Sequence, residues 1–186
     1  MIIARKIYLH FYCLPISEAL VWILGAAVVF LLLRWLIGHH ALWRRCINIA
    51  ALVWMMAIVT CTLILRSQDT GSFHVSWVPL HSYVSLMQGA NIEVLRMNFM
   101  NTVLFYPLGL LGSELLPREW TLRKRLVYAA CFAMILSSGI EIIQFLSRRG
   151  YAEMDDIIHN TAGMCLGVLT AGLPVIPVKR EVSCNE

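Results

Sequence analysis

Two polar stripes on neighbouring apolar segments hold most of the side chains in this sequence that could do chemistry. At about 100° per residue on an α-helix, the members of each stripe fall within roughly 60° of one another. They are Ser137, Glu141, Gln144 and Arg148 in the first segment and Asp156, Asn160, Gly163 and Gly167 in the second. The spacing predicts a helical hairpin whose polar faces lie opposite each other, with glycines that allow the two helices to approach closely.

Glu141 and Asp156 are the carboxylates of these stripes, and both lie in apolar surroundings. A charged group is costly there unless it is paired, protonated or in contact with water. Two such carboxylates could hold a polar ligand group, or could exchange protons with a substrate as general acid and base. No serine or cysteine nucleophile stands beside a candidate base in the sequence, so acid–base chemistry is the enzymatic alternative that remains.

The composition places these side chains in a membrane protein. Hydrophobic residues make up 59% of the 186 residues and charged residues only 14%, which is far outside the balance of soluble domains. The basic residues that produce the net charge of +4 lie mostly between apolar runs, so they indicate membrane topology, and no nucleic-acid partner is expected. The six cysteines are scattered, without a C-x-x-C pair or histidines at metal-ligand spacing, and the sequence predicts no metal and no cofactor.

The apolar runs predict an all-α integral membrane protein, a compact bundle of about five transmembrane helices. The expected spans are residues 16–37, 46–65, 97–116, 126–147 and 157–178. Residues 66–98 are more polar, and the semi-apolar piece WVPLHSYVSLMQG within them is typical of an interfacial helix or a re-entrant segment between spans two and three. Arg34, near the end of the first span, is expected to extend toward the lipid headgroups.

Glycine and proline mark where the helices should pack most closely. The third span is interrupted by Pro107 and Gly109, which predicts a kinked or tightly packed helix. Gly163 and Gly167 form a small-x-x-x-small pair in the fifth span. We therefore assign these four residues to helix packing.

An alternating five-span bundle brings several polar residues to one membrane face. They are Arg66, Asn101, Glu141, Gln144, Arg149, Asp156 and Asn160. One side of the membrane would hold six Lys and Arg residues and the other nine, so the positive-inside rule predicts an outside N-terminus, an inside C-terminus and an outer-leaflet polar site. The structural alternative is a buried network of ion pairs and amides that only holds the helices together.

Three motifs in this order resemble the VanZ-like family of bacterial membrane proteins. They are NTVLFYPLG from Asn101, EIIQ from Glu141 and RGYAEMDDIIHNTAG from Arg149. The resemblance extends over about residues 66–172, and residues 1–45 show none of it. It implies a multi-pass protein of the bacterial cytoplasmic membrane, divided into an N-terminal segment with span one (1–45), a VanZ-like membrane domain (46–178) and a polar tail (179–186).

The resemblance leaves three classes of function open. The family's namesake raises resistance to teicoplanin, a lipid-tailed glycopeptide, and this favours a non-enzymatic protein whose outer-leaflet pocket binds an amphiphilic envelope lipid precursor or a lipoglycopeptide. Membrane lipids are the other expected partners. The second class is a membrane-embedded enzyme that acts on an envelope lipid through Glu141 and Asp156. The third is a small transporter or a structural subunit.

Overall fold

The computed structural model describes residues 14–38, 41–65, 75–89, 92–148 and 152–173, and these are almost entirely helical. The long helices are α2 (Ile16–Ile37), α3 (Ala41–Val59), α5 (Glu93–Leu115), α6 (Leu122–Leu146) and α7 (Met154–Ala171). A π-helical turn, η1 (Thr60–Ile64), continues α3, and α4 (His81–Met87) is short. The strands β1 (Val75–Ser76) and β2 (Ala152–Glu153) have two residues each. The expected all-α class is confirmed.

Three of the helical segments in the described residues are long and apolar enough to cross a membrane. They are Ile16–Ile37, Leu42–Ile64 and Leu122–Leu146, with mean hydropathies of 2.5, 2.2 and 2.0. α5 and α7 are also long, but they carry the polar residues of the predicted site and face other helices over much of their surface. The expected count of five spans therefore stays a prediction for these two helices.

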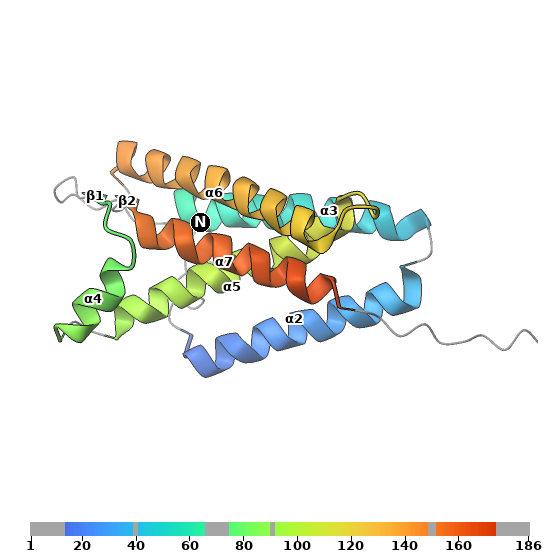
Figure 1. The fold of residues 1–186 in the computed structure, drawn as a ribbon, viewed down its shortest axis with the longest axis horizontal. Helices are drawn as coiled ribbons and strands as arrows, with labels where there is room; N and C mark the ends of the chain where they lie inside the picture. The colour runs from blue at the N-terminus through green and yellow to red at the C-terminus, as the bar shows by residue number, and fades with distance from the viewer. Residues whose placement is uncertain (1–13, 39–40, 66–74, 90–91, 149–151, 174–186) are drawn as a thin grey trace, which may run out of the picture.

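Successive long helices run in opposite directions along the bundle (Figure 1). α5 and α7 make the most extensive contact between any two elements, and α3 and α6 pack on the same pair. The end of α6, the beginning of α5 and the beginning of α7 therefore lie at one end of the bundle, together with α4. We call this the α4 end; the opposite end holds the last residues of α2, α5 and α7.

Glycines bring α5 and α7 into backbone contact. A Cβ atom on Gly163 would lie 2.2 Å from the carbonyl oxygen of Thr102, and one on Gly167 would lie 2.3 Å from that of Tyr106. Gly109, on the α5 side, would meet the Cα of Gly167 at 3.0 Å. No side chain fits at these distances, so any larger residue must separate the helices.

Pro107 lies within α5, which continues without a break to Leu115. The proline lacks an N–H, so one carbonyl of the preceding turn loses its helical partner. The neighbouring Phe105 is fully buried, in a core that includes Ile58 of α3 and Val168 of α7. Packing of the surrounding helices thus holds a helix that the proline alone would weaken.

The last helix ends earlier than the apolar run predicts. We expected the fifth span to reach residue 178, but α7 ends at Ala171. The N–H of Gly172 bonds the carbonyl oxygens of Val168 at 3.0 Å and Leu169 at 3.1 Å, and Pro174 follows closely. Hydropathy could not show this end, because the residues beyond it are also apolar. Gly172, and Pro174 after it in the sequence, are residues typical of helix ends.

The segment between α3 and α5 contains the short helix expected there. β1 pairs in parallel with β2, with Val75 opposite Ala152 and Ser76 opposite Glu153. α4 then follows, and apolar side chains beside and within it are exposed, including Trp77 at 70% and Met87 at 90%. The strand pair therefore attaches this segment to the loop between α6 and α7.

Candidate functional site

The predicted polar residues that the structure describes all lie toward the α4 end, although Arg66 and Arg149 fall outside the described residues. Asn101 lies in the first half of α5, Glu141 and Gln144 in the last turns of α6, and Asp156 and Asn160 in the first turns of α7. They make a series of bonds between different pairs of elements.

Among the predicted residues that the structure describes, Asn101 and Asp156 bond each other directly. The amide Nδ2 of Asn101 donates to Oδ1 of Asp156 at 2.6 Å, which joins α5 to α7. Asn101 is buried and Asp156 is half-buried. A short bond from an amide to a carboxylate in an apolar setting is stronger than the same bond in water. It therefore fixes the rotation of α7 against α5 beside the Gly163 contact.

Two further amides bind other helices. Asn160 donates through Nδ2 to the hydroxyl of Ser137 at 2.7 Å, which joins α7 to α6. Gln144 donates through Nε2 to the carbonyl oxygen of Thr62 at 3.0 Å, which joins α6 to η1. All of these side chains are buried. The acceptor in η1 belongs to a π-helical turn, in which the backbone is wider and the usual helical hydrogen bonds change. Such turns are frequent at functional sites.

Glu141 supports the loop between α6 and α7. Its side chain is buried at 4% exposure, and Oε2 accepts a bond of 3.1 Å from the backbone N–H of Glu153 in β2. Burial of a carboxylate is costly, and a backbone N–H compensates part of that cost. Glu141 thus holds β2, and the β1 strand paired with it, on the end of α6.

Asp155 is a site residue that the stripe argument missed. It is buried at 2% exposure, and its carboxylate accepts backbone N–H bonds from Leu80 at 2.5 Å and Ser82 at 2.8 Å. These N–H groups lie at the start of α4, where a carboxylate satisfies groups that lack helical partners. Asp155 belongs to the third motif, but its partners lie more than seventy residues earlier in the chain, and no local spacing points to them.

His159 connects α7 to α4 through both ring nitrogens. Nδ1 lies 2.6 Å from the carbonyl oxygen of Asp155, and Nε2 lies 2.8 Å from the hydroxyl of Tyr83. The carbonyl can only accept, so Nδ1 carries the proton and Nε2 accepts from the tyrosine. The two rings also stack, with centroids 5.8 Å apart and planes inclined by 16°.

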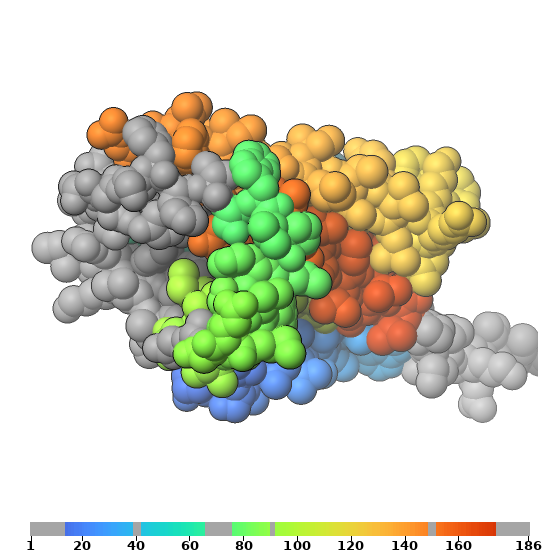
Figure 2. Space-filling view, turned by 60° about the vertical axis from the view of Figure 1, so that its left-hand side comes forward, coloured from blue at the N-terminus to red at the C-terminus, as the bar shows by residue number. Residues whose placement is uncertain are grey.

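A cavity of about 380 Å³ lies between α4, the strand pair and the beginning of α7. Its lining residues are mostly of polar types, although they also present apolar atoms to the cavity: Ser76, His81, Ser82, Ser85, Val94, Glu153 and Asp155. Figure 2 shows α4 (green) lying across this end of the molecule. The five predicted residues are absent from the lining, but Glu141 binds the backbone of Glu153, which is part of it. Glu141 therefore lies directly behind the lining of the cavity.

The region that forms this end is shared with a known family. The sequence model of the VanZ/LLP1 family matches residues 46–174, more than half of the chain. The chain belongs to the VanZ/LLP1 family. The match includes all three motifs, and it confirms the resemblance inferred from them. Searches of curated proteins and of solved structures give no significant match.

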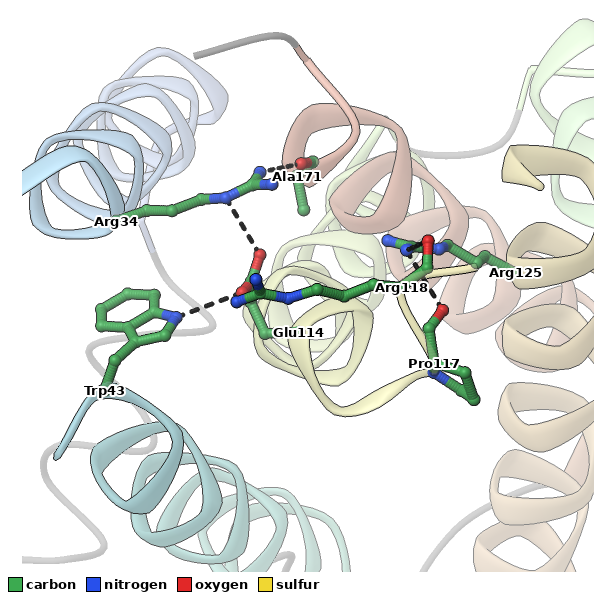
Figure 3. A network of polar contacts seen from close by, with 7 residues as sticks. All are labelled: Arg34, Trp43, Glu114, Pro117, Arg118, Arg125 and Ala171. Carbon is green, nitrogen blue, oxygen red and sulfur yellow. Dashed lines mark hydrogen bonds and ion pairs between the residues drawn. The ribbon is translucent and has the colours of Figure 1, made fainter. Parts of the chain in front are cut away.

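This VanZ/LLP1 protein has a second polar network at the opposite end of the bundle (Figure 3). Nε of Arg34 lies 3.1 Å from Oε1 of Glu114, and the indole N–H of Trp43 donates to Oε2 of Glu114 at 3.1 Å. Arg34 also donates to the carbonyl oxygen of Ala171. This network joins α2, α3, α5 and α7. The expectation that Arg34 extends toward the lipid headgroups stays a prediction.

Proposed function

We propose that this VanZ/LLP1 membrane protein binds the polar part of an amphiphilic envelope lipid or lipoglycopeptide in the cavity at the α4 end. The supporting observation is a cavity of about 380 Å³ whose lining includes serine hydroxyls and carboxylates, with exposed apolar side chains beside it, among them Val84 and Met87 of α4. A site of this kind matches a ligand that has both a polar head and a lipid chain. Binding of a lipid-tailed glycopeptide would contribute to teicoplanin-type resistance.

The lining favours ligand groups that donate hydrogen bonds. Glu153 and Asp155 bring carboxylates to the lining, and Ser76 and Ser85 bring hydroxyl groups. Both carboxylate oxygens of Asp155 already accept a backbone N–H, so a ligand would use their remaining lone pairs. Carboxylates only accept, and hydroxyls both donate and accept, so sugar hydroxyls and amines are suitable partners. Sugars and amines occur in glycopeptides, and sugars occur in lipid-linked wall precursors.

The bonds behind the cavity would preorganise this lining. Glu141 holds the backbone of Glu153, and the bond between Asn101 and Asp156 holds the first turn of α7 that carries Asp155. A binding site needs such support, because a wall that moves must be ordered at a cost when the ligand binds. This gives the polar stripes a role in ligand binding without direct contact.

The membrane orientation that we propose places this cavity outside the cell. The basic segment 117–125 carries Arg118, Arg123, Lys124 and Arg125. It lies at the other end of the bundle and consists of the loop after α5 and the first turn of α6, which begins at Leu122 rather than at the expected residue 126. The positive-inside rule assigns such a loop to the cytoplasm. A ligand from the outer envelope would then reach the α4 end directly.

The test measures teicoplanin binding to the purified protein in lipid nanodiscs. Glu153→Gln removes a lining carboxylate but keeps the backbone N–H that binds Glu141, so we expect about tenfold weaker binding from the lost charge-assisted bond. Glu119→Gln, an exposed carboxylate at the other end, is the matched control and should bind as the unchanged protein does. Vancomycin, which has no lipid tail, should bind more weakly than teicoplanin.

Two results would contradict the proposal. Equal teicoplanin affinities for the Glu153→Gln and unchanged proteins would remove the cavity as the binding site. The second result is that the protein in the same nanodiscs chemically converts a lipid-linked wall precursor, and that the Glu141→Gln and Asp156→Asn proteins do not. That result would favour the enzymatic alternative over binding.

A further inference from the structure

The end opposite α4 contains a second and larger cavity, of about 830 Å³. It lies between the beginning of α3 and the end of α5 with the loop that follows, and its lining includes Trp43, Arg44, Glu114, Leu116, Arg118 and Glu119. It shares no lining residue with the cavity at the α4 end. It is therefore a separate site with its own chemistry.

The free hydrogen-bond donors of this cavity are cationic. Both carboxylate oxygens of Glu114 are already used, by Arg34 and by Trp43. Within the part of the chain that the structure describes, the guanidinium groups of Arg44 and Arg118 have no hydrogen bond or ion pair, and both residues are exposed. Two available guanidinium groups at one cavity are suited to an anion, and a phosphate group fits their forked geometry best.

The loop that carries Arg118 is held in place by another arginine. Nη2 of Arg125 donates to the carbonyl oxygens of Pro117 at 3.2 Å and Arg118 at 3.0 Å, and its Nε donates to that of Trp120 at 3.2 Å. Figure 3 shows this clamp beside the Arg34–Glu114 pair. The backbone of Arg118 is thus fixed at the cavity, and the entropy lost when its side chain binds an anion is reduced.

An apolar groove adjoins this cavity, whose lining holds the exposed carboxylate of Glu119 beside the two arginines. The groove has a volume of about 430 Å³ and lies between α3, α5, α6 and α7, with Leu52, Leu108 and Phe132 in its lining. Leu115 and Leu116 line both the groove and the cavity. The surface therefore changes from charged to apolar over two residues. Such a surface is suited to a phospholipid, whose headgroup and acyl chain lie side by side.

We propose that this end binds an anionic phospholipid of the adjacent leaflet. Arg44 and Arg118 hold its phosphate, and an acyl chain lies in the groove beyond Leu115 and Leu116. The basic residues around the cavity, Arg45, Arg123 and Lys124, attract anionic lipid to this end but do not line the cavity. This site is independent of the ligand proposed for the α4 end, and each can be tested without the other.

The test uses delipidated protein in detergent, with phosphatidylglycerol and phosphatidylcholine as probes and native mass spectrometry as the readout. The unchanged protein should retain phosphatidylglycerol with at least about tenfold preference, which two basic residues near a lipid phosphate can supply. The double variant Arg44→Gln/Arg118→Gln should lose that preference. Arg44→Lys/Arg118→Lys keeps both charges and should retain most of it, which separates loss of charge from loss of folding.

A matched control removes the same charge outside the cavity. Arg45→Gln/Arg123→Gln should leave the lipid preference within about twofold of the unchanged protein. If it lowers the preference as much as the Arg44/Arg118 pair does, general attraction to a basic surface explains the result and the site is refuted.

The groove has its own test. The Cβ position of Gly112, in the groove lining, has only Cε of Met164 nearby, at 3.6 Å, so Gly112→Leu should fill the groove without a backbone clash. We expect several-fold weaker retention of phosphatidylglycerol. Two results would show that the acyl chain has no place in the site. One is that inorganic phosphate competes for the site as well as the lipid does, and the other is that the Gly112→Leu protein retains as much phosphatidylglycerol as the unchanged protein.

Discussion

The carboxylate of Asp155 accepts a 2.5 Å hydrogen bond from the backbone N–H of Leu80, a residue with φ of 59°. That backbone conformation is unfavourable for a residue with a branched side chain. It persists because Asp155 is buried in α7 and also bonds the N–H of Ser82. The relationship attaches α4 to the bundle and shapes the wall of the proposed ligand cavity.

Asp155→Asn should release α4 from α7. The amide retains one acceptor oxygen and faces the other backbone N–H with an NH₂ group, which cannot accept a bond. We expect the free energy of unfolding to fall by about 1–3 kcal/mol and amide exchange in α4 to accelerate. Hydrogen–deuterium exchange mass spectrometry measures the second effect directly. Exchange in α4 unchanged from the parent protein would show that Asp155 does not hold the helix.

Leu80→Gly should be neutral or stabilising. Glycine adopts positive φ without the strain that a side chain adds, which is about 1 kcal/mol at this kind of position. Little packing is lost with the Leu80 side chain, because it is 49% exposed. Val84→Gly, in the middle of α4 with 48% exposure, is the matched control and should cost about 1 kcal/mol. Thermal unfolding in detergent compares them. Similar losses for both would mean that the conformation of Leu80 carries no strain.

Gly163→Ala should destabilise the bundle, and Gly139→Ala should not. A Cβ at position 163 would lie 2.2 Å from the carbonyl oxygen of Thr102, whereas one at position 139 meets nothing within 4 Å. Separation of α5 from α7 should cost about 1–3 kcal/mol, and alanine within α6 should add about 0.5–1 kcal/mol of helix stability. Melting temperatures in one detergent suffice. A Gly163→Ala protein as stable as Gly139→Ala would disprove the close contact.

Arg34 and Glu114 should be energetically coupled. The carboxylate side chain is only 11% exposed and the arginine 30%, so a double-mutant cycle with Arg34→Gln and Glu114→Gln should give about 1–3 kcal/mol. The pair of Arg96 and Glu93 within α5 is the reference, because Glu93 is 50% exposed and such helix pairs contribute about 0.3–0.5 kcal/mol. Additive effects of the two substitutions at Arg34 and Glu114 would show that the pair adds nothing to stability.

The two ends of the bundle should lie on opposite sides of the membrane. Met87→Cys in α4 and Glu119→Cys in the basic loop place thiols at exposed positions of opposite ends, in a protein whose native cysteines are replaced. An impermeant maleimide should label position 87 in intact cells and position 119 only after lysis. The reverse pattern would invert the orientation and move the α4 cavity to the cytoplasm.

The amino-acid sequence by itself determined the class, the family and most of the helices of this protein. Apolar run length depends on local composition, and a stripe such as Glu141 and Gln144 depends on the helical period, so both can be derived from neighbouring residues. The alternating order of the expected spans placed Asn101 and Asp156 at one end of the bundle, and the structure joins them at 2.6 Å. For Arg66 and Arg149, which fall outside the described residues, the predicted site role stays a prediction.

Only the tertiary structure decided which side chains meet. Asp155 and Asp156 are adjacent and chemically identical, yet one binds the start of α4 and the other binds α5, because successive residues of a helix point about 100° apart. Arg34 and Glu114 each look like a helix-end charge in the sequence, and they pair because α2 and α5 end at the same end of the bundle. Such pairings depend on helix rotation and on distances set by Gly109, Gly163 and Gly167, which local patterns do not contain.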